Sequence, residues 1–166
     1  MHIREMKRNE KTLYRLQVGS IEMCDDLRAL GLTEQKTKNL SVRKVPKRYF
    51  SDFVRGYFDG DGNVWFVVTK KCRKTPSLTL LTAFTSCSRD FLSFLLDGLN
   101  EHGIEGGSLY DSKGNYSRLQ FGTRDSLKLY ELMYNRGTSS GLQLVRKRVV
   151  FERFQAMKKE KGAVVV

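Results

Sequence analysis

Two carboxylates close a short segment whose residue types could do chemistry. In Val54 to Gly62, VRGYFDGDG, the acids Asp59 and Asp61 alternate with glycines. The preceding aromatic and aliphatic residues recur at helical spacing, so we expect a helix that ends at these acids. Several backbone carbonyls are unbonded at such an end, and carboxylate and carbonyl oxygens are the ligands that Mg²⁺ accepts. The segment therefore predicts an oxygen-rich metal site.

Two other interpretations of the acidic segment need no magnesium. The first is a plain turn, DGDG, between a helix and a strand. The second is a calcium loop, which the sequence excludes, because Val64 replaces the required glycine and Lys70 stands where the bidentate glutamate belongs.

The glycines of the segment indicate a close helix pair. Gly56 and Gly60 are four residues apart and share one side of the predicted helix, where small residues let two helices approach closely. A glycine inside a helix costs about 1 kcal/mol relative to alanine, and a close helix contact offsets that cost. Two such helices side by side would bring two acidic ends together, and their metals could flank a scissile phosphate.

The surrounding elements predict an α+β fold. From Pro46 onward the expected order is helix, two strands, helix, two strands, helix, with helices on one face of an antiparallel sheet. The first helix carries Tyr49, Phe50, Phe53, Val54 and Tyr57, and the third is predicted to begin with Thr123 as its cap. The other elements are strands 63–70, 78–85, 109–111 and 116–122, a helix that ends at Gly103, and a last helix over 146–159.

An internal repeat divides the chain. Arg15 to Ser20 reads RLQVGS and Arg118 to Thr123 reads RLQFGT, and each copy ends a predicted strand and opens a capped helix. We therefore interpret residues 1–45 as a partial repeat from a preceding unit whose front is missing, residues 46–160 as a complete unit, and residues 161–166 as a tail.

The acidic segment resembles the LAGLIDADG motif of homing endonucleases. Gly56, Asp59, Asp61 and Gly62 stand at its most characteristic positions, and the flanks match over YFSDFVRGYFDGDGNVWFVV. The resemblance covers about Leu13 to Phe154 and includes the element order. It implies the αββαββα fold of that family and a sequence-specific, metal-dependent endonuclease of double-stranded DNA, of the intron-encoded kind.

The resemblance also implies roles for particular residues. Asp61 would bind the catalytic Mg²⁺ or Mn²⁺ with help from the Gly60 carbonyl, and Asp59 would be structural. The motif helices of two units would pack through Gly56, Gly60, Phe53 and Asp59. The family places a basic catalytic residue, commonly lysine, after the last helix of each unit. The candidates are Lys147, with Arg146 as the alternative, and Lys36 after the partial repeat.

Nucleases of this family need two motif helices in each active assembly, and this chain has one motif. The chain would act as a homodimer joined through the Ser51 to Gly60 helix or with a complementary LAGLIDADG half, or it is an inactive remnant. Two alternative functions stay open: DNA binding without cleavage, and assistance to RNA splicing as a maturase.

A β-ribbon from this fold would enter the DNA major groove. The hairpin from Trp65 to Thr85 has one face for the helices and one for DNA. The expected phosphate contacts are Lys70, Lys71, Arg73 and Lys74 in its turn, the expected base readers are Thr69, Thr79 and Thr82, and the further candidates are Lys113 and Arg118.

The bulk composition agrees with a polyanionic partner. Lysine and arginine number 30 against 18 acidic residues, a net charge of +12. With two histidines and three widely spaced cysteines, a zinc site or a Ser/His/Asp triad is not expected. No apolar run of about 20 residues and no signal-peptide core occur, so we expect a cytoplasmic or organellar-matrix protein without membrane contact.

Overall fold

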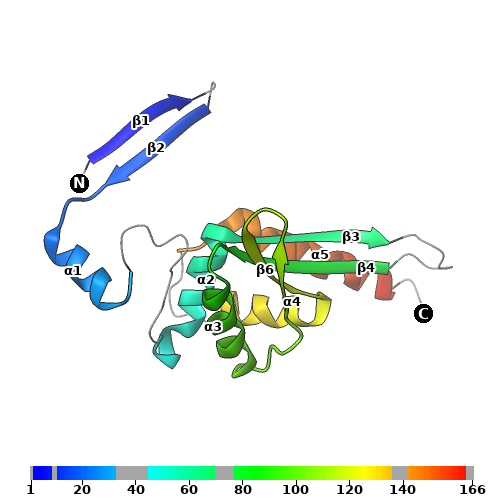
Figure 1. The fold of residues 1–166 in the computed structure, drawn as a ribbon. Helices are drawn as coiled ribbons and strands as arrows, with labels where there is room; N and C mark the ends of the chain where they lie inside the picture. Colours follow the sequence, from blue (N-terminus) through cyan, green and yellow to red (C-terminus); the bar gives the residue numbers. More distant parts are fainter. Residues whose placement is uncertain (1, 9–10, 33–44, 70–76, 136–141, 164–166) are drawn as a thin grey trace.

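The structure is a computed structural model that describes residues 2–8, 11–32, 45–69, 77–135 and 142–163 (Figure 1). Its larger part combines a four-stranded antiparallel sheet with helices, so the α+β prediction is confirmed. The element order from residue 47 onward also follows the predicted order of one helix, two strands, one helix, two strands and further helices.

The sheet has the strand order β3-β4-β6-β5. Its members are β3 (Gly62–Thr69), β4 (Ser77–Ser86), β5 (Ser108–Ser112) and β6 (Tyr116–Phe121). Paired residues in an antiparallel ladder point to the same face, so the pairs Phe66–Leu80 and Phe84–Leu119 define one side of the sheet. These side chains belong to the hydrophobic core, or pack against it in the case of Phe66.

In the described part of the chain, the helices that follow residue 45 pack on that apolar side of the sheet (Figure 1). They are α2 (Phe50–Asp61), α3 (Arg89–Asn100), α4 (Thr123–Tyr130) with the π-helical η2 (Glu131–Asn135), and α5 (Val145–Ala163). The short 3₁₀ helix η1 (Lys47–Tyr49) leads into α2. The largest fully buried side chains are Phe58, Phe84, Phe121, Phe151, Phe154, Leu80, Leu92, Leu95, Leu99, Ile104, Leu119 and Leu129.

Two serines cap helices in the structure. Ser20 accepts a hydrogen bond from the Met23 amide, and Ser88 accepts one from the Phe91 amide. The prediction that Thr123 caps α4 is wrong, because Gly122 stands at that position. The Thr123 hydroxyl instead accepts from the Leu80 amide and so joins α4 to β4.

A separate hairpin precedes the sheet. β1 (His2–Arg8) and β2 (Lys11–Gln17) pair only with each other in the described chain, and α1 (Ile21–Ala29) follows. β1 was not expected, because its sequence HIREMKR has no clear alternation of apolar and polar residues. No residue of α1 is buried.

Candidate active site

The acidic end of α2 lies at the junction of the sheet and α5. Asp61 is the last residue of the helix and is exposed. Within the described residues its carboxylate has no hydrogen bond or ion pair. A carboxylate in this position keeps its lone pairs available for a cation or an ordered water.

Lys147 holds the backbone around Asp61. Its Nζ donates to the carbonyl oxygens of Phe58 at 2.6 Å, Asp59 at 2.8 Å and Gly62 at 2.6 Å. An ammonium has three N–H donors, so all of them are used. The side chain is only 6% exposed. Lys147 follows α4 in the chain and lies in the first turn of α5, inside the range 146–159 that the sequence predicts as a helix.

Charges of both signs surround this ammonium. Burial is the main factor that lowers the pKa of Lys147, and neighbouring Arg146 lowers it further. The carboxylates of Asp59 and Asp61 act in the opposite direction. A cation beside a helix C-terminus is also favoured by the helix dipole. Lys147 therefore replaces solvent as the partner of the carbonyls at the end of α2.

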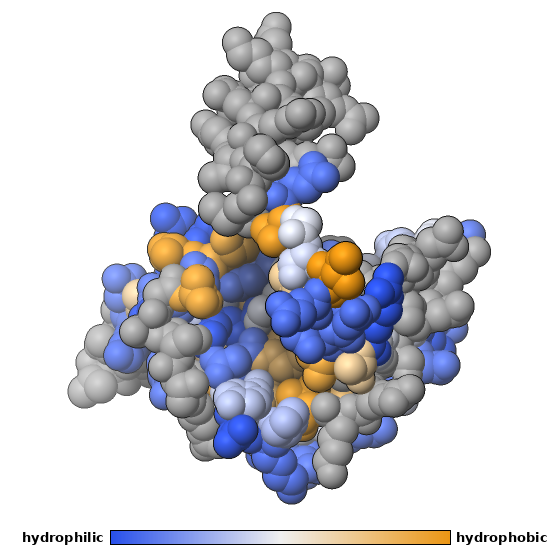
Figure 2. Space-filling model, turned by 90° about the vertical axis from the view of Figure 1, so that its left-hand side faces the viewer, coloured by the Kyte–Doolittle hydropathy of each residue, from blue (hydrophilic) through white to orange (hydrophobic). Residues whose placement is uncertain are grey.

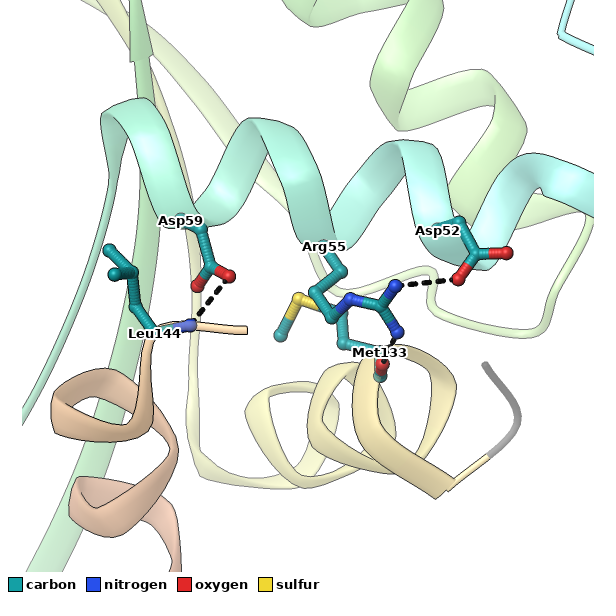
Figure 3. Close-up of polar contacts among 5 residues, drawn as sticks. All are labelled: Asp52, Arg55, Asp59, Met133 and Leu144. Atoms are coloured by element: carbon teal, nitrogen blue, oxygen red, sulfur yellow. Dashed lines mark hydrogen bonds and ion pairs between the residues drawn. The ribbon is translucent and has the colours of Figure 1, made fainter. Parts of the chain in front are cut away.

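Asp59 reinforces the same junction from the helix side (Figure 3). Its Oδ2 accepts a hydrogen bond of 2.9 Å from the amide of Leu144, which directly precedes α5. Its Oδ1 is buried and has no hydrogen-bond partner. The end of α2 and the start of α5 are thus tied together in both directions, by Asp59 from α2 and by Lys147 from α5.

Arg55 adds a polar contact that the sequence analysis did not identify. Figure 3 shows its guanidinium between two partners, the Asp52 carboxylate at 2.7 Å and the Met133 carbonyl of η2 at 3.3 Å. Arg55 is buried although α2 is otherwise apolar on its core side. Its carbonyl acceptor lies 78 positions away in the sequence, so no local pattern could have revealed the contact.

The glycine face of α2 is open. A Cβ atom built at Gly56 or Gly60 meets no atom within 4 Å, and both residues are exposed. Phe53, in contrast, is half-buried and contacts the rings of Phe91 and Phe94. Gly62 is constrained inside the unit, since a Cβ there would lie 2.6 Å from the Phe58 carbonyl oxygen. Only the first two glycines are free to receive another helix.

Tyr57 connects α2 to the end of β4. The Tyr57 hydroxyl donates to the Thr85 carbonyl at 2.6 Å. Burial is the main cause that raises the pKa of Tyr57 to about 12, with smaller effects of Asp61 and Cys87, while Ser86 lowers it. The phenol is therefore neutral at physiological pH and serves here as a hydrogen-bond donor.

The open face of the sheet carries polar and aromatic side chains. Trp65 and Thr79 alternate with core residues, so they point away from the helices. The Arg118 guanidinium lies over the Trp65 ring at 5.0 Å from its centroid. On the neighbouring strand the Tyr110 hydroxyl donates to Gln120 at 3.0 Å. The proposal of Thr82 as a base reader is wrong, because it faces the core and is fully buried.

The remaining predicted residues divide into two groups. Lys113 is exposed in the turn between β5 and β6, which agrees with a surface role. Lys36, Lys70, Lys71, Arg73, Lys74 and the side chain of Thr69 lie outside the described residues.

Neither a preformed cluster of metal ligands nor a membrane segment occurs in the described ranges. Residues 2–8, 11–32, 45–69, 77–135 and 142–163 contain no group of three or more His, Cys, Asp or Glu side chains suited to one metal ion. None of the helices in those ranges is long and apolar enough to cross a membrane.

Known proteins match this chain in structure. No protein-family model and no curated protein matches its sequence. The archaeal intron-encoded homing endonuclease I-Vdi141I, solved in complex with DNA, is 16% identical over 67% of each chain, with a TM-score of 0.50. The I-SmaMI LAGLIDADG homing endonuclease, solved bound to cleaved DNA, is 16% identical over 71% of this chain, with a TM-score of 0.50.

The alignments cover different fractions of the known proteins' own chains. The alignment covers 38% of the I-SmaMI chain. For the homing endonuclease I-TnaI it covers 74% of that chain and 68% of this one, at 21% identity and a TM-score of 0.49. At these identities the likeness to I-Vdi141I and I-SmaMI shows a shared fold.

Proposed function

We propose that this chain, which has the LAGLIDADG homing-endonuclease fold, is a metal-dependent endonuclease of double-stranded DNA that acts with a second motif helix. The observation that carries the proposal is the exposed Asp61 at the end of a helix whose Gly56 and Gly60 face is open. The solved relatives I-Vdi141I and I-SmaMI bind DNA through the same fold, which supports the substrate class.

The residues at the end of α2 fit a hard divalent cation. Asp61 offers an exposed carboxylate, and the Gly60 carbonyl is not among the three that Lys147 occupies. Mg²⁺ or Mn²⁺ bound there would complete its coordination with waters and phosphate oxygens, as Mg²⁺ commonly does. When bound, such an ion polarises a phosphate oxygen and lowers the pKa of its water.

The chain's own residues would prepare this site for DNA. Lys147 and Asp59 hold the backbone on both sides of Asp61 by contacts between α2 and α5. In this role Lys147 acts on the reaction by positioning Asp61, because its three donors are already used within the chain. Arg146, the preceding residue, is exposed and makes no hydrogen bond or ion pair within the described residues.

The open face of the sheet would contact the bases. Arg118 is placed by Trp65, and Thr79 points to the same side. An arginine that donates two hydrogen bonds to guanine is the commonest specific base contact. Lys113 and the lysine- and arginine-rich segment after β3 would contribute phosphate contacts, which add affinity and carry little sequence information.

Replacement of Asp61 tests the catalytic proposal. DNA duplexes with a randomised central region are incubated with the protein and Mg²⁺, and the cleaved molecules are selected and sequenced. On the selected target, Asp61→Asn should abolish cleavage and leave binding within about threefold, because the change removes a ligand and keeps the shape. Asp97→Asn, an exposed acid on α3, is the matched control. Cleavage by Asp61→Asn at the wild-type rate contradicts the assignment.

The open glycine face predicts that the active species contains two motif helices. Light scattering at micromolar concentration should give twice the monomer mass for a homodimer. A monomer that binds DNA without cutting it would favour the second candidate, a DNA-binding protein without cleavage activity. Competition between DNA and RNA distinguishes either function from a maturase.

A further inference from the structure

The open face of the sheet differs from the end of the molecule that Figure 2 shows. At that end hydrophilic and hydrophobic residues lie intermixed, which is ordinary for a protein surface. On the open face two polar side chains each have an aromatic partner, since Gln120 accepts a hydrogen bond from Tyr110 and Arg118 lies over Trp65. A side chain that is already held in place loses less conformational freedom when it binds a ligand.

Gln120 can be reached from the open side of the sheet. It pairs with Ala83 on β4 and with Ser108 on β5, and residues paired in this way point to the same face. Both neighbours are small, and Gln120 itself is partly exposed. A flat ligand can therefore approach the Gln120 amide edge-on between these two positions.

The hydrogen bond from Tyr110 fixes the direction in which the Gln120 amide points. The Tyr110 hydroxyl donates to Oε1 of Gln120 at 3.0 Å. A carbonyl oxygen has two lone pairs, so Oε1 can accept one further hydrogen bond. The Nε2 amino group of Gln120 has no partner among the described residues. The side chain thus presents a donor and an acceptor side by side, which is the pattern that adenine complements in the major groove with N7 and its N6 amino group.

The separation of Gln120 from Arg118 sets how far apart their ligands can lie. The two residues are two positions apart on β6, so their side chains leave the same face of the sheet. Two residues of a strand span about 6.8 Å, and successive base pairs are about 3.4 Å apart along the duplex. Side chains with this separation reach bases that are about one or two base-pair steps apart.

We infer that Gln120, positioned by Tyr110, reads an adenine that lies one or two base pairs from the guanine read by Arg118. Gln120 is then a specificity-determining residue, because its Nε2 donates to N7 of that adenine and its Oε1 accepts from N6. Tyr110 is a positioning residue that acts through the orientation of the Gln120 amide. The inference rests on the proposed function and narrows its substrate from duplex DNA to a duplex that carries this pair of bases.

A binding selection tests the inference without relying on cleavage. Randomised duplexes are captured on the full chain in the absence of divalent metal, so that no duplex is cut, and the bound molecules are sequenced. The wild-type protein should enrich an adenine within about two positions of a guanine. Gln120→Ala should reduce the preference for that adenine by about 5- to 150-fold and keep the guanine. Gln120→Arg should replace the adenine by guanine, because arginine pairs with guanine.

Tyr110→Phe tests the positioning role, since it keeps the ring and removes the hydroxyl. It should weaken the adenine preference, keep the guanine preference, and leave the melting temperature within about 1 °C. Tyr116→Phe, a change at another exposed tyrosine, is the matched control and should alter neither preference. Loss of both preferences in Tyr110→Phe would contradict the positioning role, because it would indicate a general disturbance of the face.

Two results would overturn the inference. In the first, Gln120→Ala selects the same bases as the wild-type protein at every position. In the second, the wild-type protein enriches no sequence. In either case, cleavage of duplex DNA by the wild-type protein with Mg²⁺ would leave the proposed function standing, and absence of cleavage would remove both.

Discussion

Replacement of Lys147 by methionine should destabilise the whole unit. The change keeps the length of the apolar stem and removes the ammonium that donates to the carbonyls of Phe58, Asp59 and Gly62. A hydrogen bond that involves a charged group contributes about 1.5–3 kcal/mol, and carbonyls left unpaired in a buried place add to the loss. Bonds that share one donor group are not additive, so we expect a total of about 3 kcal/mol.

The assay is thermal and urea-induced unfolding of the purified chain. For a protein of this size each 1 kcal/mol corresponds to about 2–4 °C, so Lys147→Met should lower the melting temperature by about 6–12 °C. Arg146→Met is the matched control, because it removes a neighbouring positive charge from an exposed side chain. It should change stability by less than about 0.5 kcal/mol.

The difference in melting temperature between the two variants shows whether the Lys147 ammonium stabilises the end of α2. Equal melting temperatures for Lys147→Met and Arg146→Met would refute the reasoning that the ammonium holds the end of α2. A specific fall for Lys147→Met, accompanied by faster amide exchange around Asp61, would support it. The exchange measurement distinguishes a local loosening of the helix end from a uniform loss of stability.

Three further outcomes are expected. Gly56→Leu should leave the fold of the unit intact, because a Cβ there meets no atom within 4 Å, and should reduce the mass measured by light scattering if the glycine face joins two helices. Arg118→Ala should weaken binding to the selected target by about 1–3 kcal/mol, whereas Lys113→Ala should weaken all sequences alike and reduce the salt slope by about 1. Tyr57 has a pKa raised from 10.0 to about 12 in the folded chain, so its contribution to stability is complete below pH 10 and is lost as the pH rises toward 12. Tyr57→Phe should flatten that alkaline loss in urea titrations, and an unchanged pH profile would show that another group causes it.

Local patterns in the sequence were sufficient for the element order from residue 46 onward and for the position of the acids. The apolar spacing before Asp59 and the β-branched run after Gly62 predict a helix followed by a strand, and the structure has α2 and β3 there. The capped helix expected after the repeat segment that ends at Ser20 has Ser20 as its N-cap, because capping involves residues only three apart. Such features depend on neighbours in the chain, and the sequence contains them directly.

Contacts between distant segments were decided by the tertiary structure. The sequence marks Lys147 as basic, but only the packing of α5 against α2 shows that its three donors are used by carbonyls more than 80 positions away. The same holds for Arg55 and the Met133 carbonyl. Hairpin register placed Thr79 on the open face and Thr82 in the core, since residues an odd number apart on a strand face opposite sides. The alternation of residues along a strand determines which of them share a face. Which of the two faces is buried depends on how β4 pairs with its neighbouring strands and packs against the helices.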